Sequence, residues 1–232
     1  MKKFLFAIVV SCAAFACGDA FDGQVASIVL LQDKAIQTEL KITEAQRAKL
    51  NTYGGKFNSD QKAYYAEMEK KLKANKNTKP DQAREMKMLM DLKTKVLATL
   101  NASQLKRLRE ISLQAIGVTA LADETVASRV GLNASQKTKI QGLLQSGLQA
   151  VEKIQRDTSA QAGKGIAQPK TKAEQEAAQK KFSDRMRTLG PPAEAKIESV
   201  RRKTITDVLA ILTPGQNTIW RALLGPMFKP KG

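Results

Sequence analysis

A five-residue pattern that starts helices occurs four times in this 232-residue chain. Each copy has an apolar residue, then Thr or Asn, two variable residues and Gln. The copies occupy residues 42–46, 100–104, 132–136 and 212–216. The Thr or Asn side chain can accept a hydrogen bond from a backbone N–H of the first helical turn, and the Gln can bond back to the cap residue. Four such capping boxes predict helices joined at tight corners.

The sequence assigns these motifs a defined role as helix caps. Pro214 supports the assignment in the fourth copy, because proline costs little at the first position of a helix. The role is structural, since a cap fixes a corner and supplies no reactive group. The expected capping residues are Thr43, Gln46, Asn101, Gln104, Asn133, Gln136, Thr213 and Gln216.

The rest of the chain also predicts an all-α fold. Apolar residues recur at helical spacing almost throughout, and no stretch alternates as a strand would. Asp81 is expected to start a helix after the turn at residues 76–80. Gly54-Gly55 is expected either to kink a helix or to split it. Residues 159–171 are expected to form a mobile loop, Gly190-Pro191-Pro192 to end one helix and permit another, and residues 228–232 to fray.

The motifs form two pairs with similar flanks. The second and fourth copies are both preceded by Val-Leu-Ala and followed by an arginine at the same offset, Arg109 and Arg221. The first and third copies share their own apolar register. The chain therefore reads as a tandem duplication, with units at residues 25–116 and 121–228. The second unit carries a longer insertion that contains the loop. Trp220 matches Leu108 and is interpreted as a packing residue.

The N-terminus resembles a secretory signal. Lys2 and Lys3 precede a short apolar run, and small residues follow. Residues 1–20 are interpreted as a signal peptide that is cut near Ala16 or Ala20, which places the mature protein outside the cytoplasm. An alternative keeps Cys17 as the acylated cysteine of a lipid-anchored protein. No cysteine follows Cys17, so the folded body is expected to have no disulfide.

The charge bounds the partners. The formal net charge is +17. In a cytosolic protein this would suggest nucleic acid. In an exported protein no nucleic acid is expected, and anionic lipid headgroups, envelope polymers or acidic stretches of other proteins are the plausible contacts.

Nothing in the chain indicates an enzyme, a cofactor or a metal site. There is no histidine to serve as a base or ligand. Met86, Met88 and Met90 are the one soft-ligand cluster, but alternate positions on a helix diverge. Met86 and Met90 are interpreted as core and Met88 as exposed. Together with Tyr64 and Tyr65, the methionines are candidates for adaptable contacts with a partner.

The four motifs resemble the LTxxQ signature of the periplasmic Spy/CpxP family. The resemblance includes the order of the helices around the motifs and extends over most of the mature chain. The resemblance implies thin, curved helical hairpins that form a cradle with a basic, partly apolar concave face. It also implies ATP-independent binding of unfolded or misfolded envelope proteins. The alternatives are a regulatory or adaptor role with one specific partner in envelope stress and, less favoured, metal sensing or scavenging.

The sequence departs from the family pattern in two respects. Two of the four motifs have Asn in place of Thr, which preserves capping. Two units also share one chain, where family members have two motifs per subunit. The resemblance then implies an intramolecular pseudo-dimer that forms the cradle within a single polypeptide.

Overall fold

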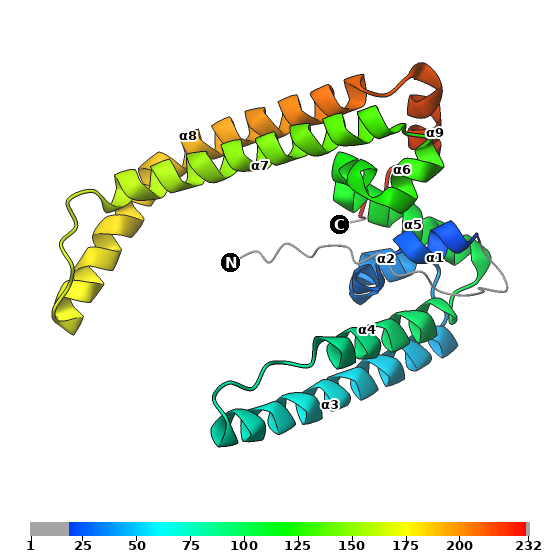
Figure 1. The fold of residues 1–232 in the computed structure, drawn as a ribbon, viewed down its shortest axis with the longest axis horizontal. Helices are drawn as coiled ribbons and strands as arrows, with labels where there is room; N and C mark the ends of the chain where they lie inside the picture. The colour runs from blue at the N-terminus through cyan, green and yellow to red at the C-terminus, as the bar shows by residue number, and fades with distance from the viewer. Residues whose placement is uncertain (1–18, 231–232) are drawn as a thin grey trace. The chain divides into compact units, whose positions relative to one another are not determined.

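The computed structural model describes residues 19–230 and has an all-α fold, as expected. No strand occurs in this range, and none of its helices is both long and apolar enough to cross a membrane. Cys17 lies outside the described residues. The elements are α1 (Ala20–Val25), η1 (Ile28–Gln32), α2 (Lys34–Glu39), α3 (Glu44–Ala74), α4 (Gln82–Leu97), α5 (Ala102–Ile116), η2 (Gly117–Ala122), α6 (Glu124–Val130), α7 (Ala134–Gly163), α8 (Lys172–Ala210) and α9 (Pro214–Leu224), with η denoting a 3₁₀ helix (Figure 1).

The chain divides into two compact units. Unit 1 runs to Gly117 and resumes at Trp220, while unit 2 comprises Val118–Ile219. The duplication suggested a second unit that ends at Phe228. In the structure, the residues from Trp220 onward group with the first unit instead.

Unit 1 is organised around α5, which is buried along most of its length. Leu108 and Leu113 are fully shielded from solvent, and Leu105 and Ile111 are nearly so. Apolar residues of η1, α2 and the C-terminal part of α4 pack into the same core. The α3–α4 hairpin extends from this core and is only two helices thick. Each of its helices can therefore bury only the apolar stripe that faces the other helix.

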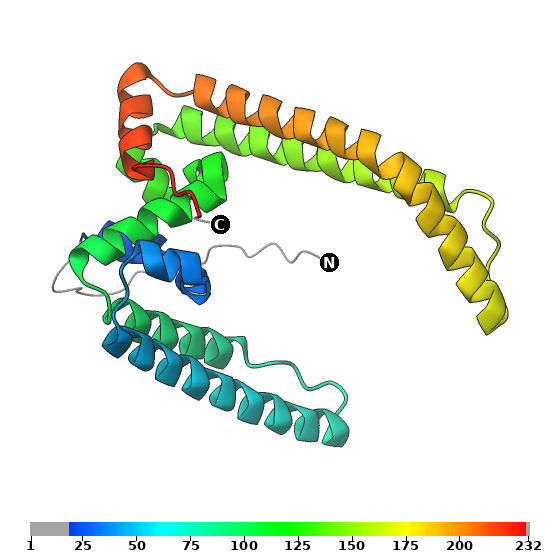
Figure 2. The same ribbon diagram turned by 180° about the vertical axis from the view of Figure 1, so that it is seen from behind.

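Unit 2 consists mainly of a long antiparallel pair. Helices α7 and α8 lie side by side in both views (Figures 1 and 2). Ile140 of α7 and Ile197 and Val208 of α8 are buried. The helices approach closely at Gly147, where an added Cβ would lie 2.5 Å from Thr204 Oγ1. The absence of a side chain at this position therefore permits the packing.

Replacing Gly147 with alanine should lower the free energy of unfolding. The methyl group would meet a stiff, β-branched threonine at a cost of about 1–3 kcal/mol, partly offset by about 1 kcal/mol of helix propensity. Gly142 is the matched control, because it lies in the same helix with nothing within 4 Å of its Cβ position. Gly142→Ala should stabilise the protein by about 0.5–1 kcal/mol. Thermal unfolding measures both, and effects of the same sign would contradict the close approach.

One expected helix break was wrong. Pro191 and Pro192 lie inside α8, which continues from Lys172 to Ala210. Figure 2 shows that α8 bends along its length without stopping. Proline removes a backbone donor and kinks a helix, but packing can carry the helix through it. Here the helix pairs with α7 on the C-terminal side of the prolines, where Ile197 and Val208 are buried.

The expected loop is shorter than the sequence indicated. Residues 159–163 belong to α7, and Arg185 secures the end of that helix by donating hydrogen bonds to the backbone oxygens of Ala162 and Lys164. The connection to α8 therefore spans residues 164–171. Gly54 and Gly55 do not split the first long helix, since α3 is continuous from Glu44 to Ala74.

Candidate functional site

The two motifs of unit 1 each close a reciprocal capping box. Thr43 Oγ1 accepts from the backbone N–H of Gln46 at 3.2 Å, and the Thr43 N–H donates to Gln46 Oε1 at 3.0 Å. Asn101 and Gln104 make the same pair of bonds at 2.9 and 3.0 Å. Asparagine therefore caps as well as threonine does here, as its carbonyl oxygen allows.

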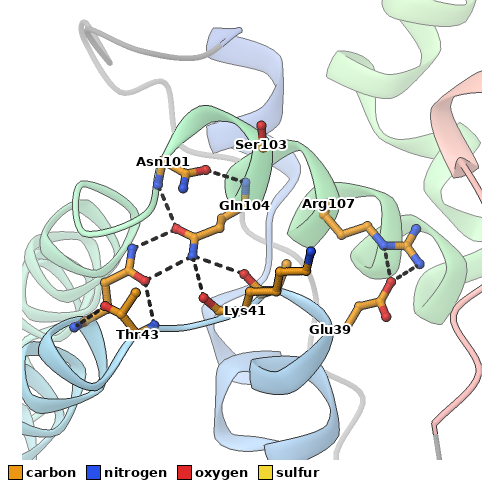
Figure 3. Close-up of a pocket in the computed structure, with 9 residues that line it drawn as sticks. Glu39, Lys41, Thr43, Asn101, Ser103, Gln104 and Arg107 are labelled. Atoms are coloured by element: carbon orange, nitrogen blue, oxygen red, sulfur yellow. Dashed lines mark hydrogen bonds and ion pairs between the residues drawn. The ribbon is translucent and has the colours of Figure 1, made fainter.

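The two glutamines also bond to each other, which the sequence did not predict. Gln46 Nε2 donates to Gln104 Oε1 at 2.7 Å, and Gln104 Nε2 donates to Gln46 Oε1 at 3.0 Å. The same amide groups reach the backbone of the other corner, since Gln46 donates to Thr99 O and Gln104 to Leu40 O. Figure 3 shows Gln104 at the centre of this network. Each glutamine thus completes its own cap and ties together two corners 58 residues apart.

Unit 2 repeats the arrangement. Asn133 and Thr213 cap their helices with the matching bonds to Gln136 and Gln216. Gln136 Nε2 donates to Gln216 Oε1 at 2.8 Å, and the return bond is 3.0 Å. We call two motifs whose glutamine side chains bond to each other a motif pair. Both motif pairs are networks within a single unit.

The backbone enters the first motif of each pair in the left-handed region. Lys41 has φ 51° and the matched Gly131 has φ 78°. Glycine adopts this conformation freely, whereas a lysine does so at a cost of about 1 kcal/mol. The matching geometry at two different residue types indicates that the corner itself demands it.

A pocket of about 370 Å³ lies beside the motif pair of unit 1. Lys41 and Arg107 are the cations that line it, and the Arg107 guanidinium pairs with Glu39 at 2.6 Å and with Glu110 at 2.9 Å. Partial burial opposes the charge, yet these two hydrogen bonds raise the pKa of Arg107. The Arg107 guanidinium is therefore already engaged by two carboxylates. The pocket is lined by Glu39, Leu40, Lys41, Thr43, Gln46, Asn101, Ser103, Gln104 and Arg107.

A second pocket of about 410 Å³ lies between α3 and α4, and most of the residues that line it are aromatic or aliphatic. We call it the hairpin groove. It contains most of the residues that the sequence singled out for adaptable contacts, and it omits Met90. Its lining residues are Phe57, Gln61, Tyr64, Tyr65, Gln82, Glu85, Met86, Met88 and Leu89.

The two tyrosines in the hairpin groove have different environments. Tyr64 is buried, and this burial raises the pKa of its phenol. The Tyr64 hydroxyl accepts a hydrogen bond from the Asp81 N–H at 2.7 Å. Tyr65 is 53% exposed, and its ring lies 5.4 Å from that of Tyr64. Tyr64 therefore fastens the hairpin and Tyr65 is accessible to a partner.

The methionines do not divide as the sequence suggested. Met86 and Met90 were expected in the core and Met88 on the surface, but all three side chains are half-buried. Leu89, between them, is 41% exposed. A thin two-helix hairpin explains this pattern, because it has too little interior to enclose a full apolar stripe. The result is a partly open apolar surface.

An ionic cluster holds the tip of the same hairpin. Glu67 pairs with Lys71 at 2.7 Å and with Arg84 at 2.8 Å, and Arg84 also stacks over the Tyr64 ring at 5.1 Å. Hydrogen bonds from Lys71 and then from Arg84 lower the pKa of Glu67 from 4.5 to about 2. The cluster therefore links α3 to α4 at any pH where Glu67 is ionised.

The stabilising effect of Glu67 should be pH-dependent. Because the folded-state pKa is lowered, its contribution is complete above the pKa of a glutamate in the unfolded chain and is lost as pH falls towards 2. Glu67→Gln should lower the melting temperature at pH 7, and the gap from wild type should close near pH 2. Glu69→Gln, which removes one exposed pair with Lys73, is the control. A gap that stays constant with pH would contradict the assignment.

The C-terminal segment forms a further feature of unit 1 that the sequence did not reveal. Residues 220–230, which we call the strap, comprise the end of α9 and the residues after it. Side chains of α5 donate hydrogen bonds to this segment. Trp220 and Leu223 are buried, and Phe228 packs against the core. The expectation that the chain frays from residue 228 was wrong for Phe228, whose N–H donates to Gln114 Oε1 at 2.8 Å.

A buried arginine of α5 links the strap to the start of unit 1. Arg109 is 4% exposed, pairs with Asp22 at 2.8 Å and donates to Leu223 O. Its guanidinium also lies 5.6 Å from the Phe21 ring centre. The matched residue Arg221 is exposed. Equal offsets from a motif therefore led to opposite environments.

Among residues 19–230, no group of three or more His, Cys, Asp or Glu side chains is arranged to hold a metal ion. Comparison with known proteins adds no assignment. No protein-family model matches the chain, and neither a curated protein nor a solved structure matches it.

Proposed function

We propose that the protein is an exported, ATP-independent, chaperone-like binder of unfolded or misfolded envelope proteins, related to the LTxxQ-motif Spy/CpxP family. The hairpin groove is the observation that carries this proposal. It presents aromatic, methionine and leucine side chains that are partly exposed, on a helical pair with little core of its own. Methionine and tyrosine adapt to partners of varied shape.

The charge of the hairpin supports the same function. Between residues 44 and 97 the chain has thirteen Lys or Arg and seven Asp or Glu. A positive surface accelerates encounters with acidic segments, while apolar contacts prolong the bound state. Capture of an exposed apolar segment with acidic neighbours fits both properties.

The motif pairs support the family relation. Each Gln closes its own cap and bonds across to the partner motif, so the Thr or Asn and the Gln must occur together in both copies. This gives a physical reason for an LTxxQ-like pattern to be repeated within one unit. The proposed export and envelope location rest on the N-terminal signal alone.

Suppression of aggregation tests the proposal directly. A chemically denatured client is diluted into buffer with increasing amounts of the mature protein, and light scattering is recorded. We expect less scattering at stoichiometric ratios and a weaker effect at high salt, which screens the encounter. No suppression at stoichiometric excess would reject the function.

Matched surface variants locate the binding surface. Leu89→Ser removes an exposed apolar side chain from the hairpin groove, and Val29→Ser removes one of similar exposure, 47%, from η1. We expect Leu89→Ser to weaken client binding about fivefold, as loss of about 1 kcal/mol implies, and Val29→Ser to leave it unchanged. Equal losses of client binding in the two variants would show that clients do not bind at the hairpin groove. Capture of one dominant envelope protein, with no general holding of clients, would instead favour the regulatory alternative.

A further inference from the structure

The hydrogen bonds that Arg107, Arg109 and Gln114 of α5 make to the strap all go to main-chain atoms of the strap. Arg107 donates to Pro226 O at 2.7 Å, and Gln114 Nε2 donates to Leu224 O at 2.6 Å and to Pro226 O at 2.9 Å. Arg109 donates to Leu223 O, and Gln114 accepts from the Phe228 N–H. Because α5 bonds to backbone atoms, these hydrogen bonds require a particular backbone conformation in the bound segment and not particular side chains, as in other peptide-docking sites. We call these three side chains of α5 the seat.

One contact makes the seat selective. Gly225 has φ 61°, and an added Cβ would lie 2.4 Å from the carboxyl group of Glu110. Glu110 is buried and is held by Arg107, so it cannot move aside readily. A segment that fills the seat must therefore have glycine at this position, in the left-handed conformation, followed by a backbone that can reach Gln114. Few unrelated segments meet this condition, whereas every copy of this chain does.

The strap is also distant in the chain from the seat that it fills. The whole of unit 2 separates α5 from Trp220, so no local turn enforces the contact. An identical strap from another molecule could make the same hydrogen bonds and present the same glycine. Binding within one chain is favoured only by the effective concentration of the strap near the seat, which the connection through unit 2 sets.

We propose that the seat on α5 binds the strap of a second copy of this chain, which gives a strap-exchanged dimer. Each copy has one seat and one strap, so a pair that exchanges both leaves no seat empty and the assembly closes at two. The monomer dominates in dilute solution, and exchange becomes appreciable at protein concentrations near the effective concentration of the chain's own strap.

A labelled peptide tests binding between molecules. The probe is a fluorescent peptide of residues 220–230, and its anisotropy is measured with full-length protein. In the variant Gly225→Leu the chain's own strap cannot seat, so the peptide should bind it about tenfold more tightly than wild type. A peptide that carries the same substitution should not bind. Trp220 is the only tryptophan in the chain, so a red shift of its emission in Gly225→Leu reports that the chain's own strap has left.

The oligomeric state tests the exchange itself. By sedimentation, wild type should form dimers as concentration rises, whereas Gly225→Leu should remain monomeric. Met227→Ala is the matched control, because Met227 lies in the strap but is 69% exposed, and it should dimerise as wild type does. Isotope-labelled and unlabelled wild-type protein should form mixed dimers by native mass spectrometry, which requires no variant. A wild type that is monomeric at every concentration, or a helical Gly225→Leu variant that fails to bind the peptide, would overturn the proposal.

Discussion

Replacing Arg109 with methionine should lower the free energy of unfolding by about 3–5 kcal/mol, the usual cost of leaving a buried charge without its partner. The guanidinium is nearly inaccessible and pairs with Asp22, which is also buried. The substitution removes that pair and leaves the Leu223 carbonyl oxygen without this donor. Urea unfolding followed by circular dichroism measures the effect.

Arg221→Met is the matched control for this substitution. It changes the arginine at the same offset from the fourth motif, which is exposed, and should alter stability by less than about 0.5 kcal/mol. The double variant Asp22→Leu with Arg109→Met should recover part of the loss, because it removes both buried charges. Similar losses for Arg109→Met and Arg221→Met would show that burial of the ion pair is not the cause.

The second large effect is expected at Gln104. Replacement with leucine removes the acceptor for the Asn101 N–H and the donor to Leu40 O, and it removes the two hydrogen bonds between the Gln46 and Gln104 amides. Because Gln104 is 7% exposed, water cannot readily substitute, and we expect a loss of about 2–4 kcal/mol. Thermal unfolding of the variant measures it.

Gln216→Leu is the comparison within unit 2, where the same bonds are made by a half-buried residue. Water can reach this site more easily, so the expected loss is about 1 kcal/mol. A double-mutant cycle with Gln46 and Gln104 should yield a coupling energy of about 0.5–3 kcal/mol, since the two side chains contact each other. A coupling near zero would show that each Gln acts only as a cap.

Local chemistry made the helix starts predictable. Thr43, Asn101, Asn133 and Asp81 each accept a hydrogen bond in the first turn of the helix that the sequence assigned to them. A cap needs only residues within one turn, so sequence spacing is sufficient to find it. The all-α fold follows from the same local signals and from the helical period.

Features that depend on distant partners were not predictable. The crossed glutamines join corners that the sequence separates by 58 and 80 residues, and their spacing in the motif explains only the cap. Pro191 and Pro192 read locally as a helix end, but pairing with α7 overrides that preference. Arg109 and Arg221 show the same limit, because equal sequence context gave one buried and one exposed residue. The pseudo-dimer remains a prediction.

The position of the strap has a consequence for how the chain is made. A ribosome completes residues 118–219 before it reaches Trp220, so the second unit has its full sequence while the first still lacks a part of its own. Loss of the codons for residues 220–230 should therefore damage the first unit, which is synthesised first, rather than the second. A premature stop after residue 219 would leave Arg109 without its C-terminal acceptor and the seat open, and such a chain should be a preferred substrate for quality-control proteases.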